Sequence, residues 1–99
     1  MTSREVSLSA NDTPVELNSF VQGFIDHIVG GILAALRGTG DIKDADILIE
    51  GDTVVITLNE ARVPINPFVT AIIRNTIVGM VSSLEGISEA KSIHIHIRR

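Results

Sequence analysis

The chain has 99 residues, with 12 acidic and 8 basic side chains and a formal net charge of −4 at pH 7. This length predicts one domain that folds without disulfide or metal cross-links. The absence of cysteine excludes disulfides, a thiolate nucleophile and cysteine-ligated metals or clusters. The acidic balance argues against nucleic-acid binding, which relies on neutralising phosphates. With three Phe, no Tyr and no Trp, the chain also lacks stacking platforms for bases.

The N-terminal residues are polar and contain no apolar signal core. The longest nearly continuous apolar run, residues 27–36, has about half of the ~20 residues that a membrane span needs. We therefore expect a cytoplasmic protein without a membrane span. The mean hydropathy of +0.35 is high for a small soluble domain, which indicates that part of the apolar surface packs against another chain.

Residues 1–12 are predicted to be a polar N-terminal arm, although the alternation over residues 5–9 also fits a short strand. The run Thr13-Pro14-Val15-Glu16 predicts a helix start, with a capping threonine, proline at the first helical position and a capping-box glutamate. Apolar residues then recur every three or four positions to Leu36, and Gly38 is expected to end the helix. Its solvent-facing side is expected to carry Gln22, Asp26 and Arg37.

Residues 45–50 and 53–58 are rich in β-forming residues and flank Gly51-Asp52, which predicts a β-hairpin. A second helix is expected after Asn66-Pro67 and is expected to stop at Gly86. Residues 92–98 alternate strictly and predict a final strand.

These elements predict a two-layer α+β domain over residues 13–99, in the order α-β-β-α-β. Two helices are expected on one face of a three-stranded mixed sheet, with the last strand parallel to one of the hairpin strands because a strand–helix–strand connection crosses over. No internal repeat is evident in this order of elements.

The same order resembles the C-terminal domain of NifU-type iron–sulfur scaffold proteins and, more broadly, the iron–sulfur cluster assembly domain-like fold. The likeness covers about residues 16–97 and rests on four stretches: 38–42, 49–58, 67–80 and 83–95. The family binds its cluster through a Cys-x-x-Cys pair just before the helix proline, and the matching positions here are Val63 and Asn66. Neither side chain replaces a thiolate, so the resemblance implies the architecture but not cluster binding, and no cofactor is predicted.

His94 and His96 are the strongest metal-ligand candidates, because residues i and i+2 of a strand point the same way about 7 Å apart. The alternative is an ordinary polar face opposite the isoleucines of that strand. A third ligand is not evident, since His27 lies on the first predicted helix.

Two further groups of polar residues have ordinary explanations. The acidic run from Asp41 to Asp52 does not follow the ligand spacing of a calcium loop and fits a solvated rim. Arg62 and Arg74 flank the loop before the second helix, where they are expected either to bind an anion at the helix N-terminus or to pair with Glu60 or solvent. A pocket near Arg62, Asn66 and Arg74 is the remaining hypothesis for a small enzyme. No catalytic residue is assigned.

Glycines inside a helix cost about 1 kcal/mol each relative to alanine, so their presence in the first helix indicates close packing against another helix or another chain. Together with the apolar second helix they predict an interface, formed by Gly23, Gly30, Gly31, Ile72 and Ile73. The leading hypothesis is therefore a non-enzymatic interaction or scaffold module that forms a homo-oligomer, preferably a homodimer. The alternative is a metal-binding or metal-delivery protein that uses His94 and His96.

Overall fold

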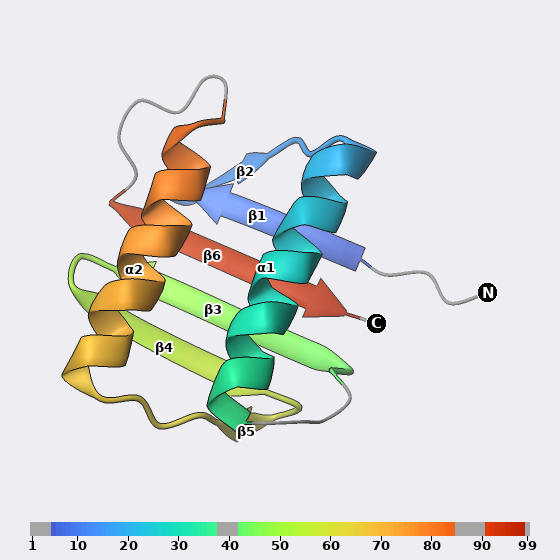
Figure 1. Cartoon of the computed structure of the whole chain (residues 1–99). Helices are drawn as coiled ribbons and strands as arrows, with labels where there is room; N and C mark the ends of the chain where they lie inside the picture. The colour runs from blue at the N-terminus through green and yellow to red at the C-terminus, as the bar shows by residue number, and fades with distance from the viewer. Residues whose placement is uncertain (1–4, 38–41, 85–90, 99) are drawn as a thin grey trace.

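The computed structural model describes residues 5–37, 42–84 and 91–98, and shows two helices on one face of a β-sheet (Figure 1). The helices are α1 (Ser19–Arg37) and α2 (Pro67–Ser82), and the strands are β1 (Glu5–Ala10), β2 (Thr13–Val15), β3 (Asp44–Glu50), β4 (Thr53–Leu58), β5 (Ala61–Arg62) and β6 (Ser92–Arg98). The predicted α+β class with two helices is confirmed.

The sheet differs from the predicted one. It has six strands in the order β2-β1-β6-β3-β4-β5, and every neighbouring pair is antiparallel. The prediction of a three-stranded mixed sheet is therefore wrong. β6 does run in the same direction as β4, because both are antiparallel to β3, but the connection through α2 crosses over β3 and inserts β6 between β3 and β1.

The N-terminal part of the chain belongs to the sheet. Residues 5–10 form β1, and Leu8 and Ala10 are buried beneath the helices. Residues 13–15 form β2 rather than the start of a helix, because the chain turns at Asn11 and Asp12, which have φ angles of 53° and 65°. α1 begins at Ser19, and the predicted helix ends at Gly38 and Gly86 lie outside the described residues.

The domain consists of two halves with the same element order, β1-β2-α1-β3 and β4-β5-α2-β6. A shift of 48 positions aligns them without a gap, starting with Glu5 on Thr53. The identical pairs are Val6/Val54, Asn11/Asn59, Val15/Val63, Asn18/Asn66, Phe20/Phe68, Val21/Val69, Ile25/Ile73, Gly31/Gly79, Leu36/Leu84, Gly38/Gly86, Lys43/Lys91, Ile47/Ile95 and Ile49/Ile97. The prediction that the chain contains no internal repeat is therefore wrong.

The strand pairing and the helix caps obey the same repeat. The equivalent strands β1 and β4, β2 and β5, and β3 and β6 occupy mirrored places in the strand order. At the centre of the sheet, the equivalent residues Ile47 and Ile95 lie opposite each other. The side chain of Asn18 accepts the backbone N–H of Val21 at 2.8 Å, and that of Asn66 accepts the N–H of Val69 at the same distance. Each half therefore begins its helix with the same asparagine cap.

The core lies between the helices and the sheet and is almost entirely aliphatic, because alternate strand residues and one stripe of each helix point into it. Its fully buried members include Leu8, Ile25, Leu33, Ile47, Ile49, Ile56, Ile77, Ile93, Ile95 and Ile97. Asp26, predicted on the solvent side of α1, is instead only 1% exposed. Both described helices lie on the first face of the sheet, and no described helix covers the other face (Figure 1).

Candidate functional site

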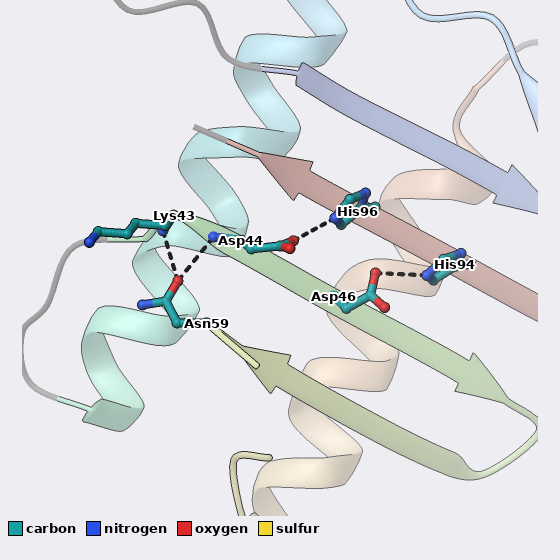
Figure 2. Close-up of polar contacts among 6 residues, drawn as sticks. All are labelled: Lys43, Asp44, Asp46, Asn59, His94 and His96. Carbon is teal, nitrogen blue, oxygen red and sulfur yellow. Dashed lines mark hydrogen bonds and ion pairs between the residues drawn. The ribbon is translucent and has the colours of Figure 1, made fainter. Parts of the chain in front are cut away.

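The face of the sheet away from the helices holds both histidines of β6, each beside an aspartate of β3 (Figure 2). Nε2 of His94 lies 2.8 Å from Oδ1 of Asp46, and Nε2 of His96 lies 2.5 Å from Oδ1 of Asp44. Because an ionised carboxylate only accepts, each Nε2 carries the hydrogen of its bond. All four side chains are between 38% and 45% exposed, so the pairs lie on an open surface.

This arrangement does not gather a metal-ligand set. Within the described part of the chain, no group of three or more His, Asp or Glu side chains is placed to hold a metal ion. His27 lies on α1, in the opposite layer, where its Nδ1 donates to the carbonyl of Gly23 at 2.8 Å. The two histidines of β6 therefore form separate pairs with separate carboxylates.

Strand order brings two serines to the same face, which sequence reasoning missed. Ser9 lies directly opposite His94 and Ser7 directly opposite His96 in the β1–β6 register. Each histidine thus stands between a hydroxyl and a carboxylate, the residue types of a nucleophilic triad. However, among the described residues neither serine Oγ is hydrogen-bonded to its histidine. In the sequence, the only sign of these serines was their alternation in residues 5–9. That alternation places them beside the histidines only once β1 is known to pair with β6.

An open depression of about 530 Å³ lies around Ser9, His94 and Asp46. Its apolar lining is Leu48 and Val55. Its other lining residues are Ser9, Asp12, Asp46, Thr57, Ser92 and His94. It is a shallow part of a twisted sheet, and its one imidazole is already bonded to its carboxylate. The face therefore has polar groups suited to weak surface contacts.

Because the His94–Asp46 pair is nearly half exposed, its contribution to stability should be small. We expect Asp46→Ala to change the free energy of unfolding by less than about 1 kcal/mol. Urea denaturation followed by circular dichroism measures this change. A loss several times larger would show that the pair organises the sheet.

Of the two predicted anion-binding residues, Arg74 has structural partners. Nε of Arg74 donates to the carbonyl of Gly51 at 2.5 Å and lies 3.6 Å from Asp52, so it ties α2 to the β3–β4 turn. Asn66 caps α2, and Arg62 lies exposed in β5. An open depression of about 500 Å³ near Arg74 is lined by neither Asn66 nor Arg62. Of these three residues, only Arg74 therefore lines this depression.

The acidic residues predicted to form a solvated rim are spread over β3 and its turn. Asp44 and Asp46 pair with the histidines, whereas Glu50 and Asp52 are exposed. Asp41 lies outside the described residues.

The positions that the NifU-type resemblance matches to cluster ligands have structural roles. Val63 is 4% exposed, and its N–H donates to the carbonyl of Ile56. Asn66 accepts hydrogen bonds at the start of α2. Both positions serve the connection between β5 and α2.

The outer face of the two helices carries the most exposed large apolar side chains of the described residues. Phe20 and Phe24 of α1 are 75% and 46% exposed, and their equivalents in α2, Phe68 and Ile72, are 72% and 49% exposed. The rings of Phe20 and Phe24 stack with centroids 6.0 Å apart. We call this face the helix-layer surface, defined by Phe20, Phe24, Gly31, Phe68, Ile72 and Gly79.

The helix-layer surface is also nearly free of charge. The helices contain only three charged residues, Asp26, Arg37 and Arg74. Asp26 is buried, and Arg74 is held by the β3–β4 turn; the side chain of Arg37 is not described. An apolar, uncharged surface on both helices is the kind that marks a contact site.

The predicted interface residues fall into three groups. Gly31 and Ile72 are exposed on the helix-layer surface, and Gly23 and Gly30 are half-buried. Ile73 is only 2% exposed and belongs to the core. A Cβ added at Gly23 or Gly31 would meet no atom within 4 Å, so packing inside the fold does not require glycine there.

Residues Ser19–Leu36 of α1 are long and apolar enough to cross a membrane by length and composition, with a mean hydropathy of 1.5. Core helices of soluble proteins pass the same test, but only 22% of this segment is buried in the fold. The helix therefore has more apolar surface than the sheet beneath it covers.

No protein-family model, curated protein or solved structure matches the chain.

Proposed function

We propose that this protein is a non-enzymatic interaction module that forms a homo-oligomer through the helix-layer surface, with a homodimer as the favoured state. The observation that carries the proposal is the exposure of four large apolar side chains on an uncharged pair of helices. Cluster loading is not part of the proposal, because Val63 and Asn66 stand where the NifU-type family has its ligands.

The energy available from this surface is large enough to support association. At about 200 Å² for a large side chain and ~25 cal/mol per Å², covering the exposed parts of these four residues is worth roughly 10 kcal/mol for each chain. Association costs an estimated ~4–15 kcal/mol in lost translational and rotational freedom. Two such surfaces in contact therefore exceed the cost.

The alternative hypothesis, metal binding or delivery by His94 and His96, has weaker support. Each imidazole already pairs with its own aspartate, and the described residues supply no third ligand beside them. An enzymatic role is weaker still, because the serines opposite these histidines are not bonded to them and the face is open.

Size-exclusion chromatography with light scattering tests the proposal. We expect a mass near twice the 10.6 kDa of one chain at high micromolar concentration. Buried aromatic anchors typically contribute 2 kcal/mol or more, so Phe20→Ser combined with Phe68→Ser should weaken association by at least about tenfold. The control is Leu48→Ser, which replaces a large apolar side chain by serine on the opposite face and should leave the mass unchanged.

A strict monomer at high micromolar concentration would contradict the proposal directly. So would a dimer that the two serine substitutions leave intact, because contact would then lie elsewhere on the molecule.

A further inference from the structure

The two helices lie side by side and run in opposite directions across the sheet, so their N-terminal ends lie at opposite ends of the helix layer (Figure 1). Phe20 and Phe24 lie in the first two turns of α1, and Phe68 and Ile72 are their equivalents in α2. The large exposed side chains therefore occupy two diagonally opposite corners of the helix-layer surface.

The other two corners carry small residues. Toward the end of α1, Gly31 and Ala35 are exposed, and their equivalents Gly79 and Ser83 are exposed in α2. The hydroxyl of Ser83 donates to the carbonyl of Gly79 at 3.0 Å, so covering this serine leaves no unpaired donor. The surface thus alternates large, small, large and small around its four corners.

We propose that the occupant of the helix-layer surface is a second copy of this chain, turned face to face about a two-fold axis so that the aromatic corners of each copy sit over the glycine corners of the other. This inference rests on the self-association proposed above and specifies its geometry. The spacing of these residues along α1 fits this arrangement. When α1 of one copy lies antiparallel on α1 of the other, with the midpoint between His27 and Ile28, Phe24 lies opposite Gly31 of the other copy and Phe20 lies opposite its Ala35.

A second copy suits this surface because a two-fold interface uses the same patch on both chains and must be complementary to itself. The alternation of large and small corners supplies this complementarity in shape. Like charges facing each other would oppose it, but the exposed helix positions whose side chains are described carry none.

The area also fits a dimer. At about 200 Å² per large side chain, the exposed parts of the four residues amount to roughly 400–500 Å². A stable interface buries about 800 Å² per partner, so the other exposed residues of the two helices must contribute the rest. The repeat explains why both glycines are kept, since each receives a large residue from the other copy.

A membrane surface fits less well. Helices that lie on membranes carry Lys and Arg along their polar side, whereas the strand face and its turns here carry mainly acidic groups. The exposed or half-exposed carboxylates there are Glu5, Asp12, Asp44, Asp46, Glu50, Asp52 and Glu60, against Lys43, Arg62, Lys91 and Arg98.

The decisive variant is Gly31→Leu combined with Gly79→Leu. In one chain a Cβ at either position meets nothing within 4 Å, and leucine favours a helix over glycine, so the monomer should melt at a higher temperature. In the dimer the new side chains occupy the space of the facing aromatics, and the dissociation constant should rise at least tenfold. Analytical ultracentrifugation measures that constant, and circular dichroism at low concentration measures the melting.

The control is Thr53→Leu, which places the same leucine side chain at an exposed position of β4 and should leave the dissociation constant unchanged. A dimer unaffected by both leucines would overturn the inference while leaving the proposed self-association standing. A strictly monomeric native chain would overturn both.

Because the chain has no cysteine, single-cysteine variants report the geometry cleanly. His27 and its equivalent Asn75 lie at the middle of the two helices, where facing helices meet. If α1 faces α1, we expect His27→Cys and Asn75→Cys each to form a disulfide-linked homodimer on mild oxidation. If α1 faces α2, we expect the disulfide to form only when the two variants are mixed. Glu60→Cys, on a turn of the sheet, should form no disulfide-linked dimer.

A dimer in which neither midpoint cysteine cross-links, alone or mixed, would overturn the face-to-face arrangement. Sedimentation with neutral phosphatidylcholine vesicles tests the alternative occupant, a lipid surface. Vesicle binding by a chain that stays monomeric in solution would assign the surface to lipid and overturn the inference.

Discussion

Replacing Ile95 by alanine is expected to lower the free energy of unfolding by about 2–5 kcal/mol, as large-to-small substitutions in a packed core do. Ile95 is 1% exposed and sits in the middle of a row that crosses the sheet from Leu8 through Ile95 and Ile47 to Ile56. Domains of this size are stable by only about 5–15 kcal/mol. The substitution therefore removes a large part of the total, which urea denaturation measures.

The internal repeat makes this prediction sharper. Ile47 is the equivalent of Ile95 in the first half, is equally buried, and faces it across β3 and β6. Ile47→Ala should therefore cost nearly the same as Ile95→Ala. The double variant should depart from the sum of the two, because neighbouring cavities merge.

Leu48→Ala provides the matched control, because Leu48 is half-buried on the opposite face of β3. Its loss should be clearly smaller than that of its neighbour Ile47. If Ile95→Ala lost less than about 1 kcal/mol, the row would not be the tightly packed centre that its burial indicates.

Elements set by local patterns were predicted closely. The last strand, predicted over residues 92–98, is Ser92–Arg98, and the predicted hairpin strands 45–50 and 53–58 are Asp44–Glu50 and Thr53–Leu58. The second helix begins at Pro67 after its Asn66 cap. Alternation and capping are visible within a few residues, which is why these predictions succeeded.

The start of the first helix was missed because two signals competed. Thr13-Pro14-Val15-Glu16 fits a helix start, but Thr13–Val15 follow the Asn11–Asp12 turn and pair with β1 as an edge strand. Only the partner strand decides between the two. The true cap, Asn18, is the equivalent of Asn66, so the repeat at a shift of 48 was the signal that would have located it.

The sheet order could not be read from local patterns either. β6 belongs to the second half but lies between β1 and β3 of the first half, so its place depends on contacts between segments that are distant in the sequence. The same contacts decide which polar groups meet on the open face, as with His94 and Asp46. Hence the histidines were found in the sequence but their carboxylate partners were not.

The helix-layer surface was predicted in part. Gly31 and Ile72 were both named as interface residues and are both exposed, but their aromatic neighbours Phe20 and Phe68 were not named. Ile73 follows Ile72 by about 100° around the helix, which turns it into the core. The exact helix phase, which sequence periodicity leaves open by about one residue, decides which of two adjacent isoleucines is exposed.

Replacing Asn11 or Asn59 by alanine is expected to lower the free energy of unfolding by about 2–3 kcal/mol each, the largest effect expected outside the core. Oδ1 of Asn11 accepts the backbone N–H groups of Lys91 and Ser92 at 2.8 and 3.2 Å. Asn11 also has a φ of 53°, where alanine is disfavoured. Its turn therefore depends on both the side chain and the left-handed backbone.

Asn59 makes the equivalent contacts in the other direction. Its Oδ1 accepts the N–H groups of Lys43 and Asp44 at 2.9 and 3.0 Å, and its φ is 48° (Figure 2). Each asparagine thus fixes the first residues of a central strand that belongs to the other half of the repeat. Because the two turns contact different strands, the losses in the double alanine variant should add.

Glycine at the same positions separates the two causes. Asn11→Gly and Asn59→Gly keep the left-handed backbone accessible but lose the accepting oxygen, so they should be intermediate between asparagine and alanine. Equal losses for glycine and alanine in urea denaturation would assign the whole effect to the hydrogen bonds. Unequal losses at Asn11 and Asn59 would show that the two halves, although built on one pattern, no longer depend equally on their shared turn.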